Sequence, residues 1–451
     1  MKVAIIGAGG VRTPLIVSAM ARRRAQLGLT ELALMDIDGP RLDLIAPLLP
    51  PAPGFTVTAT VDAVDALAGA DFVITTFRVG GIAARVIDET VPLRYDVLGQ
   101  ETTGPGGFAM ALRSIPVLLG YIDVMRQHCP DAWLINFANP AGLMAEAALR
   151  LGAWQRTVGI CDAPESMLRV AAAILQASPA EVYLDYFGLN HLGWVRGIHY
   201  GGRDHLPRLI AMLRAAGTMP GLPFSPDFIE SLGMIPNEYL YYYYHGRQAV
   251  DNLRSAGATR GQQLLALNDA LFDTLARLAE QGDVEGMRRA HEDYLHEREH
   301  TYMARETGSA HDPAAMAPAL AAAIVGEGYA GIALDVIEAL SGGRPRHIVL
   351  NVPNAGAIPA MERDAVVEIP ALVSTGSVRP LAVGEVPPEQ LGLMLQVKAY
   401  ERLTISALAG ASRRTAVHAL AVHPLVRDAG LAERIFDDYA AAHGALFPAL
   451  S

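Results

Sequence analysis

Residues 1–14 read MKVAIIGAGGVRTP, and this stretch contains the signals that decide the fold. Val3 to Ile6 form an uninterrupted apolar run, which predicts a buried strand of a parallel sheet. The pattern that begins at Thr13 and Pro14 suits the first turn of a helix. Between strand and helix lie the glycines of a tight turn: Gly7, Gly9 and Gly10.

This arrangement predicts a site for the diphosphate of a dinucleotide, because glycines let the backbone approach the ligand and the helix dipole favours an anion. Only part of the GxGxxG fingerprint is present, since position 12 is Arg. A second apolar strand ends in Asp36, where an acid about 20 residues past the glycines binds the ribose hydroxyls of NAD. The alternative is an ordinary tight turn in an α/β fold. The predicted NAD-binding residues are Gly7, Gly9, Gly10, Val11, Arg12, Thr13, Asp36, Thr76 and Asn136.

The composition describes a globular chain of 451 residues, which is long enough for two or more domains. Its formal net charge of −11 argues against nucleic acid or an anionic membrane as the main partner. We find no uninterrupted apolar stretch of about 18 residues, the length that a membrane span needs. Two cysteines do not form a disulfide framework, and with no visible signal peptide they lead us to expect a cytoplasmic protein.

Short apolar strands alternate with helical stretches up to about residue 160, which predicts a doubly wound parallel sheet of the Rossmann type. The expected strands are 2–6, 32–35, 72–76, 133–137 and 157–160. Ligands of such sheets bind beyond the carboxyl ends of the strands, so the segments that follow the strands form the candidate rim. We place the nucleotide-binding domain at residues 1–165 and an α+β domain for substrate, metal and oligomer contacts at residues 166–451.

The remaining segments are mixed in character. Four glycines and a proline in residues 99–107 predict a shaped loop, and a helix should follow from Phe108 to Met125. A long helical pattern covers residues 258–300, and the tail from 388 to 446 is helical. Residues 328–373 suggest a second, small βαβ-like region with strands near 347–352 and 364–368.

Cys161 and His191 each follow an expected strand, and a thiolate and an imidazole could share a divalent metal. No CxxC or HxxxH pattern accompanies this pair. The alternative is a buried free thiol and a core histidine whose hydrogen bonds are satisfied. A metal held by only two protein ligands would keep open positions for substrate oxygens, which suits Lewis-acid chemistry.

Asp162 has two interpretations, a helix N-cap before Pro164 and Glu165 or a general acid at the rim. The tyrosine-rich run 239–244 predicts either an aromatic helix face or a phenol that acts as base. Such a phenol needs a cation or metal that lowers its pKa towards neutrality.

Arg94 and Arg260 are candidates for binding an anionic substrate group, because a guanidinium pairs bidentately with phosphate. Either arginine could instead form a surface ion pair. Glu101, in the glycine-rich stretch, could belong to the shell of a metal or lie on a polar loop that binds nothing.

Seven motifs follow one another along the chain: Gly7-Ala8-Gly9 with Thr13-Pro14, Gly99-Gln100-Glu101-Thr102-Thr103-Gly104-Pro105-Gly106-Gly107, Asn136-Phe137-Ala138-Asn139-Pro140, Cys161-Asp162-Ala163-Pro164, Gly188-Leu189-Asn190-His191, Tyr239-Leu240-Tyr241-Tyr242-Tyr243 and Asn351-Val352-Pro353-Asn354-x-Gly356. In this order they resemble the NAD- and metal-dependent glycosidases of glycoside hydrolase family 4, and most closely its 6-phospho-β-glucosidases. The resemblance covers nearly the whole chain.

The resemblance implies a role for each matching residue. Cys161 and His191 fall on the two protein ligands of a divalent metal, typically Mn²⁺, and Tyr239 falls on the tyrosine that acts as base. Asp162 falls where the α-specific members place their acid. The implied substrate-binding residues are Arg94, Glu101, Asn139, Asn190 and Arg260, with the two arginines near the sugar 6-phosphate.

The resemblance also implies hydrolysis through a temporary oxidation. A hydride leaves C3 of the sugar for NAD, the proton at C2 becomes acidic, and Tyr239 removes it. The aglycone then leaves from C1, water adds, and the hydride returns, so the net reaction is hydrolysis of a 6-phospho-β-glucoside. This family is an exception to the scheme that uses two carboxylates. The resemblance further implies a homodimer or homotetramer.

One motif departs from the phospho-β pattern, which is usually Cys-Asn-x-Pro, because this chain has Asp162 after Cys161 as the phospho-α members do. A 6-phospho-α-glucosidase is therefore one alternative within the family. The Gly-Gly-Ala-Tyr-Tyr-Ser that β-members often carry after the long helix is also not found near Arg305-Glu306-Thr307-Gly308, which makes a hydrolase of unphosphorylated glycosides the other alternative. A dehydrogenase of the malate/lactate type would share the parallel sheet, but it normally uses a His–Asp pair and no metal. A non-catalytic NAD-responsive sugar sensor would bind without turnover.

Overall fold

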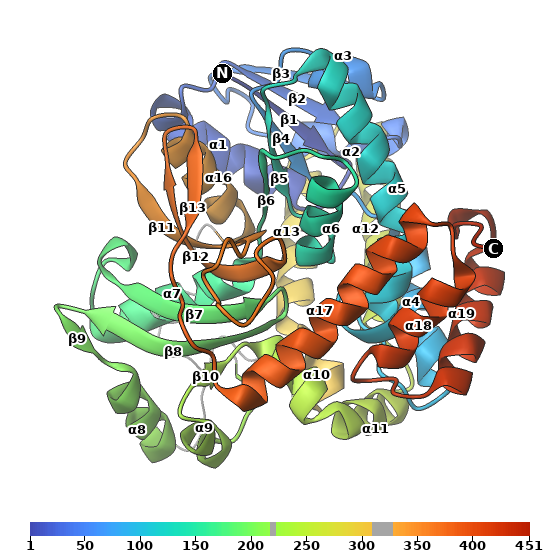
Figure 1. The fold of residues 1–451 in the computed structure, drawn as a ribbon. Coiled ribbons are helices and arrows are strands. Elements are labelled where there is room, and N and C mark those ends of the chain that lie inside the picture. Colours follow the sequence, from blue (N-terminus) through green and yellow to red (C-terminus); the bar gives the residue numbers. More distant parts are fainter. Residues whose placement is uncertain (217–221, 309–327) are drawn as a thin grey trace.

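The computed structural model describes residues 1–216, 222–308 and 328–451. Its main sheet contains the strands β1 Lys2–Ile6, β2 Glu31–Met35, β3 Thr56–Thr60, β4 Phe72–Thr75, β5 Trp133–Asn136, β6 Thr157–Gly159, β11 Arg346–Pro353, β12 Val366–Ser374 and β13 Ser377–Pro380. Their order in this nine-stranded sheet is β13-β12-β11-β6-β5-β4-β1-β2-β3 (Figure 1). The strands from β6 to β3 are parallel, which confirms the predicted doubly wound Rossmann-type sheet.

All five parallel strands expected from the sequence are buried almost throughout, because each lies in the middle of the sheet. Strand β3 was not expected. Its sequence, TVTAT, has no buried residue and contains three threonines, so it lacks the apolar run that marks an inner strand. It forms the outer edge next to β2.

The predicted βαβ-like region at residues 328–373 is wrong in its topology. Strands β11 and β12 pair antiparallel without a helix between them, and β13 pairs antiparallel with β12. Asn351 of β11 pairs with Gly159 of β6, so these late strands extend the main sheet. The domain division at residue 165 stays a prediction, and strands from beyond that position complete the sheet.

A second, smaller sheet is antiparallel and contains β7 Tyr183–Leu189, β8 Leu192–Tyr200, β9 Arg203–Asp204 and β10 Ile235–Pro236. Strands β7 and β8 form a hairpin whose two-residue turn is Asn190-His191. His191 has a φ of 61°, which is uncommon for a residue other than glycine and occurs where surrounding contacts hold it.

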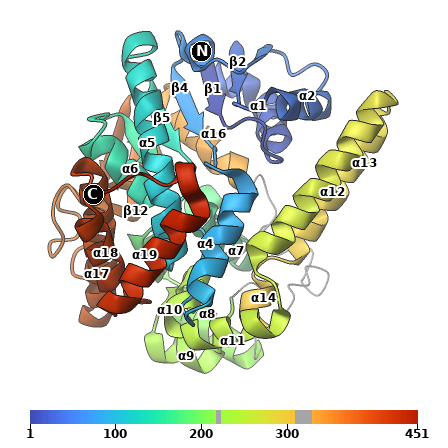
Figure 2. The same cartoon turned by 90° about the vertical axis from the view of Figure 1, so that its right-hand side faces the viewer.

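Helices cover both faces of the main sheet, with α1 and α16 on one side and α5 and α6 on the other (Figures 1 and 2). The α-helices are α1 Thr13–Leu27, α2 Gly39–Ile45, α3 Ala63–Leu67, α4 Gly81–Leu93, α5 Gly104–His128, α6 Ala141–Arg150, α7 Asp162–Leu175, α8 Leu206–Ala216, α9 Pro226–Leu232, α10 Tyr241–Tyr244, α11 Gly246–Ala256, α12 Arg260–Glu280, α13 Val284–His300, α14 Ala304–Thr307, α16 Gly328–Leu340, α17 Pro388–Ala409, α18 Arg413–Val422 and α19 Ala429–His443. Short 3₁₀ helices are η1 Ala46–Leu48, η2 Pro179–Glu181, η3 Glu238–Leu240 and η5 Gly444–Leu446. The last three α-helices confirm the predicted helical tail.

The helical pattern predicted for residues 258–300 forms two antiparallel helices, α12 and α13, that project from the body of the protein (Figure 2). The chain turns at Gln281-Gly282, and Gly282 adopts a left-handed conformation that favours glycine. The apolar faces of the two helices pack on α2 and η1 in the N-terminal part of the chain. This small core contains Val11, Ile45, Leu48, Leu271, Leu275, Met287 and Tyr294.

Helix α5 begins at Gly104, so the glycines at 104, 106 and 107 belong to its first turn and not to the predicted loop. A Cβ atom on Gly106 would lie 2.4 Å from the carbonyl oxygen of Gln100, and one on Gly107 would lie 2.0 Å from that of Thr102. The glycines therefore let the preceding loop, which carries Glu101, pack against the helix. Contrary to our expectation, α5 is long and apolar enough to span a membrane, but 61% of its apolar window is buried inside the protein, as in a core helix.

Replacing Gly107 by Ala should lower the free energy of unfolding by about 1–3 kcal/mol, because backbone atoms must move to accept the methyl group. Gly120 lies in the same helix with no atom within 4 Å of its Cβ position. The Gly120→Ala variant should therefore be as stable as the wild type or more stable by up to about 1 kcal/mol. Denaturant unfolding of both variants measures the difference, and equal stabilities would contradict the packing explanation.

Candidate active site

The glycine turn lies at the carboxyl end of β1, where strands β2 and β4 also end. Gly7 has a φ of 95°, and a Cβ on it would lie 2.5 Å from the amide nitrogen of Phe77. The amide of Gly9 donates a 2.8 Å hydrogen bond to Oδ2 of Asp36, which leaves no room for a side chain at Gly9. Thr76 Oγ1 donates to the carbonyl oxygen of Gly7 at 3.1 Å.

The start of α1 has the properties of an anion site. Its N-cap residue, Arg12, provides no side-chain cap to the first-turn amides, and the first turn contains no acidic residue. Gly10 is exposed, and Thr13 is the buried first residue of the helix. The amides and the helix dipole therefore fit the diphosphate of NAD.

Two other predicted NAD-binding residues make contacts within the protein. The carbonyl oxygen of Val11 faces His291 Nε2 of α13 at 2.7 Å, so the projecting helices brace the glycine turn. Asn136 is buried at the end of β5, where Oδ1 accepts from Thr75 at 2.8 Å and Nδ2 donates to the carbonyl oxygen of Ala138 at 2.9 Å. Asn136 thus shapes the loop that continues to Asn139.

His191 lies against Tyr239, and Cys161 is close enough to influence the Tyr239 hydroxyl electrostatically. The His191 ring stacks on the Tyr239 ring with 3.5 Å between centroids and 7° between planes. Cys161 is buried directly before α7, and it is among the groups that, after burial, raise the pKa of Tyr239. The structure therefore places both predicted metal ligands in the neighbourhood of Tyr239.

The chemistry of these two side chains fits a divalent metal. His191 Nδ1 is buried and has no hydrogen-bond partner among the residues that the structure describes. Burial, opposed in part by Glu101, lowers the pKa of His191 to about 3, so its ring is neutral and keeps a lone pair for a cation. Burial and the neighbouring carboxylates of Glu368 and Asp162 raise the pKa of the Cys161 thiol, and a bound cation would reverse that effect.

No group of three or more His, Cys, Asp and Glu side chains is arranged to hold a metal within residues 1–216, 222–308 and 328–451. A metal at Cys161 and His191 would therefore take its other ligands from substrate or water, as Lewis-acid chemistry on a substrate requires.

Acidic side chains lie near Cys161 and Tyr239. Asp162 is half-buried in the first turn of α7, whose N-cap is Cys161, so the alternative of Asp162 as N-cap is wrong. Burial, with help from Asp162 and Glu368, raises the pKa of Glu238 to about 7. Burial likewise raises the pKa of Glu368 to about 7, although Tyr186, Asn190 and Asn351 donate hydrogen bonds to it.

Basic side chains surround the carboxylate of Glu101. Arg85 of α4 is buried, donating from Nη1 to Glu101 at 3.0 Å and from Nε to Glu89 at 2.7 Å. Arg78 forms a second ion pair with Glu101. Burial disfavours the charged forms, but these pairs outweigh it, so the pKa of Glu101 is lowered and that of Arg85 is raised. Glu101 is thus an ionised acid held between two arginines.

The predicted place of Arg94 at the site is wrong. Its side chain is 62% exposed just after the far end of α4 and pairs with Asp438 at 3.6 Å, which is the surface ion pair that the sequence left open. Arg85, in the middle of α4, is the arginine of this helix that reaches the site. Arg94 lies nine residues after Arg85, which is about two and a half helical turns. The two side chains therefore leave α4 on different faces, and Arg94 does so at the exposed end.

Arg260 and Asn190 are near the site but are engaged with protein atoms. Arg260 Nη1 donates to Thr301 Oγ1 at 2.6 Å, and Nη2 donates to the carbonyl oxygen of Arg298 at 2.6 Å. Asn190 Oδ1 accepts from the amide of Ala141 at 3.0 Å, and its Nδ2 donates to Glu368 at 3.2 Å. Both therefore position neighbouring segments. Asn139 is half-buried before a cis bond to Pro140, and its substrate contact stays a prediction.

Sequence reasoning missed several residues of this cluster: Arg85, Glu89, Glu238, Tyr302 and Glu368. Arg85 and Glu89 could have been found, since they stand four residues apart on the helix that follows the third predicted strand. Tyr302 and Glu368 lie far along the chain from their partners, and no local pattern marks them.

Comparison with known proteins agrees with this geometry. A family model described as "Family 4 glycosyl hydrolase" matches residues 2–177, and one described as "Family 4 glycosyl hydrolase C-terminal domain" matches residues 186–426. A probable 6-phospho-beta-glucosidase of Bacillus subtilis is 30% identical over 99% of this chain and 97% of its own length.

Two solved structures extend the comparison. The 6-phospho-beta glucosidase from Thermotoga maritima, solved with NAD and glucose-6-phosphate, is 28% identical over the full length of both chains, with a TM-score of 0.86. A 6-phospho-alpha-glucosidase from gut microorganisms, in complex with NAD and Mn²⁺, is 26% identical over 100% of this chain and 99% of its own, with a TM-score of 0.82. Because the two family models together match most of the chain, the protein belongs to glycosyl hydrolase family 4.

Proposed function

We propose that this chain hydrolyses 6-phospho-β-glucosides to glucose 6-phosphate and an aglycone, with NAD and Mn²⁺ as cofactors. The observation that carries the proposal is the stack of Tyr239 on His191 beside Cys161. It combines a phenol with two side chains that can bind a metal. The same protein has, at the carboxyl end of β1, a glycine turn that suits a dinucleotide. A malate/lactate-type dehydrogenase has no use for this combination, and membership of family 4 sets that alternative aside.

When bound, NAD supplies reversible oxidation at C3 of the sugar and the metal polarises the resulting ketone, which together make the C2 proton acidic. Tyr239 is the side chain that takes this proton. Asp162, in the adjacent first turn of α7, donates a proton to the leaving oxygen at C1. Arg85 and Arg78 provide positive charge for the 6-phosphate, and Glu101 fixes both guanidinium groups in place.

A 6-phospho-α-glucosidase is the second candidate, and Asp162 favours it because the motif of this chain is the α-type Cys-Asp. The similar structures include enzymes named for each anomer, with 28% and 26% identity. We keep the β-glucoside as the first proposal, since the flanking motifs resemble the β-type members.

We also propose a cytoplasmic setting, which is supported by two free, buried cysteines and by relatives that act on phosphorylated sugars. The homodimer or homotetramer implied by the family resemblance remains a proposal, to be measured by light scattering.

Nitrophenol release from 4-nitrophenyl 6-phospho-β-glucoside should require NAD and Mn²⁺ together. Removing the metal with a chelator should abolish release, and adding Mn²⁺ back should restore it, because Cys161 and His191 alone cannot polarise the sugar. NADH should not accumulate, since the hydride returns in each turnover. Cleavage that survives exhaustive chelation, or NADH formed in step with product, would contradict the proposal.

Arg85→Lys should raise KM for the 6-phosphorylated substrate by about 10-fold or more, because lysine cannot reproduce the planar guanidinium that pairs with Glu101 and Glu89 at once. Arg94→Lys is the matched control and should leave kcat and KM unchanged, since Arg94 is exposed at the other end of the same helix. Steady-state kinetics of both variants decide the assignment. An equal rise of KM in both would return the phosphate role to Arg94.

Asp162→Asn converts the motif to the β-type Cys-Asn. If Asp162 is the acid, cleavage of a methyl 6-phosphoglucoside should slow by about 100-fold or more, whereas the nitrophenyl substrate, whose leaving group needs no proton, should react at nearly the wild-type rate. Both anomers are assayed with each leaving group. Equal slowing for both leaving groups would show that Asp162 does not act as the acid.

A further inference from the structure

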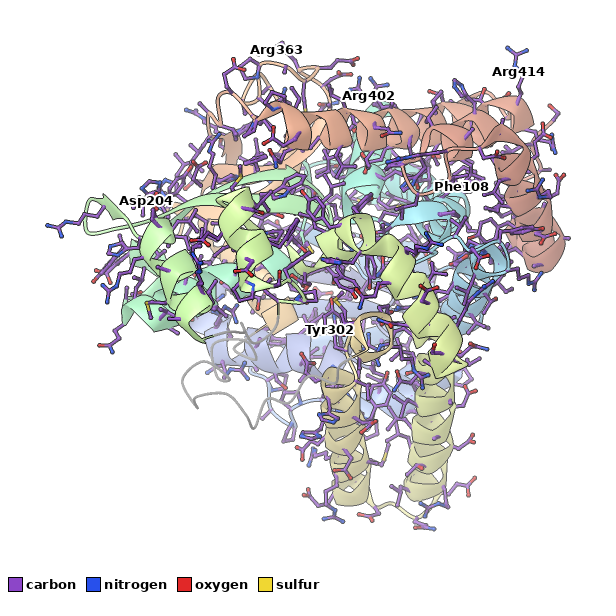
Figure 3. All side chains as sticks on the ribbon, turned by 90° about the horizontal axis from the view of Figure 1, so that it is seen from below. Phe108, Asp204, Tyr302, Arg363, Arg402 and Arg414 are labelled. Carbon is purple, nitrogen blue, oxygen red and sulfur yellow. The ribbon has the colours of Figure 1, made fainter. Side chains whose placement is uncertain are left out.

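The projecting helices α12 and α13 contact the glycine turn through the side chain of Val11. Val11 is 9% exposed, and it belongs to the small core that the two helices form with the N-terminal part of the chain. Figure 3 shows the pair from below, extending away from the labelled Tyr302, which follows α13. One residue of the turn that suits a diphosphate is therefore packed into the helix pair.

A second contact holds the backbone of Val11. Its carbonyl oxygen lies 2.7 Å from Nε2 of His291, which comes 280 residues later in the chain and is 5% exposed. A carbonyl oxygen can only accept, so Nε2 carries the hydrogen and donates it. Backbone amides around the turn donate to the carbonyls of Gly7, Gly10 and Arg12. Among the residues that the structure describes, His291 is thus the donor on which the Val11 carbonyl depends.

The amide of Val11 makes no hydrogen bond within the described part of the chain, whereas the amide of Gly9 is taken by Asp36. The direction of the Val11 amide is restricted, because the backbone has only two soft torsions per residue and both the side chain and the carbonyl of Val11 are held. An anion at the turn would meet an amide that is already oriented, which lowers the entropic cost of binding.

We propose that His291 is a positioning residue for NAD, and that α12 and α13 act through it to keep the cofactor bound from one turnover to the next. The inference rests on the proposed function, in which the hydride returns to the sugar and NAD does not need to leave. His291 acts through the backbone of Val11, and it lies outside every motif that the sequence shows.

Calorimetric titration of NAD into the NAD-free enzyme, with no sugar present, measures this effect without turnover. His291→Leu removes the donor, so the carbonyl of the buried Val11 loses its partner and the turn moves. The Kd for NAD should rise by about 10-fold. In steady-state assays the KM for NAD should rise by a similar factor, whereas kcat at saturating NAD and KM for the sugar should stay near the wild-type values.

Two further variants separate positioning from stability. His291→Gln keeps a side-chain N–H that can reach the same carbonyl, and its Kd for NAD should stay within about 3-fold of the wild type. Tyr294→Phe is the matched control, because it removes a hydroxyl of the same core that donates to Asn268 of α12 and not to the turn. It should lower the thermal stability without changing the Kd for NAD.

Equal Kd values for the wild type and His291→Leu would overturn the inference and leave the proposed function intact. An equal rise in Tyr294→Phe would do the same, since the effect would then belong to the helix pair as a whole. A wild-type enzyme that binds no NAD would overturn both. If thermal unfolding shows that His291→Leu is not folded, His291→Asn replaces it with the same expectation, because its shorter amide cannot reach the carbonyl.

Discussion

The active-site geometry depends on one buried carboxyl group, that of Glu368. Three side chains donate hydrogen bonds to it, from β7, from the β7–β8 turn and from β11. Loss of any donor would leave a buried polar group unsatisfied, which costs about 1–3 kcal/mol. Through Asn190 this carboxyl holds the turn that presents His191, and through Asn351 it holds the strand that joins the main sheet at β6. This carboxyl group therefore fixes the position of the smaller sheet relative to the main sheet.

Charge is divided across the site. Arg78 and Arg85 neutralise Glu101 on one side, while Asp162 and Glu238 gather near Cys161 on the other. The neutral imidazole of His191 lies close to Glu101. A phosphorylated sugar that also binds a divalent cation has the complementary pattern, with its anionic end towards the arginines and the cation towards the acids. A net charge of −11 for the whole chain does not oppose this, because local ion pairs dominate at such distances.

The sequence was sufficient for the features that local patterns encode. Periodicity and composition predicted the glycine turn, the apolar inner strands and the helical tail. The family motifs identified Tyr239, Cys161 and His191 as site residues. It was insufficient where the deciding contact is distant in the chain. The polar edge strand β3 has no apolar run, the antiparallel addition of β11 to β13 depends on pairing with Gly159, and Tyr302 meets Tyr239 only through tertiary packing. Arg94 was named and Arg85 was not, because a linear motif does not show which side of a helix faces the ligand.

The late arrival of β11 has a consequence for synthesis on the ribosome. The chain produces β6 as the last parallel strand, and its partner on the outer side, Asn351, emerges only after the second sheet and the projecting helices have been made. Until then the nascent N-terminal half exposes an unpaired strand edge, the kind of surface that recruits other chains. Closure of that edge is a long-range event with a large loop entropy, so we expect it to be slow and chaperone-dependent compared with helix formation.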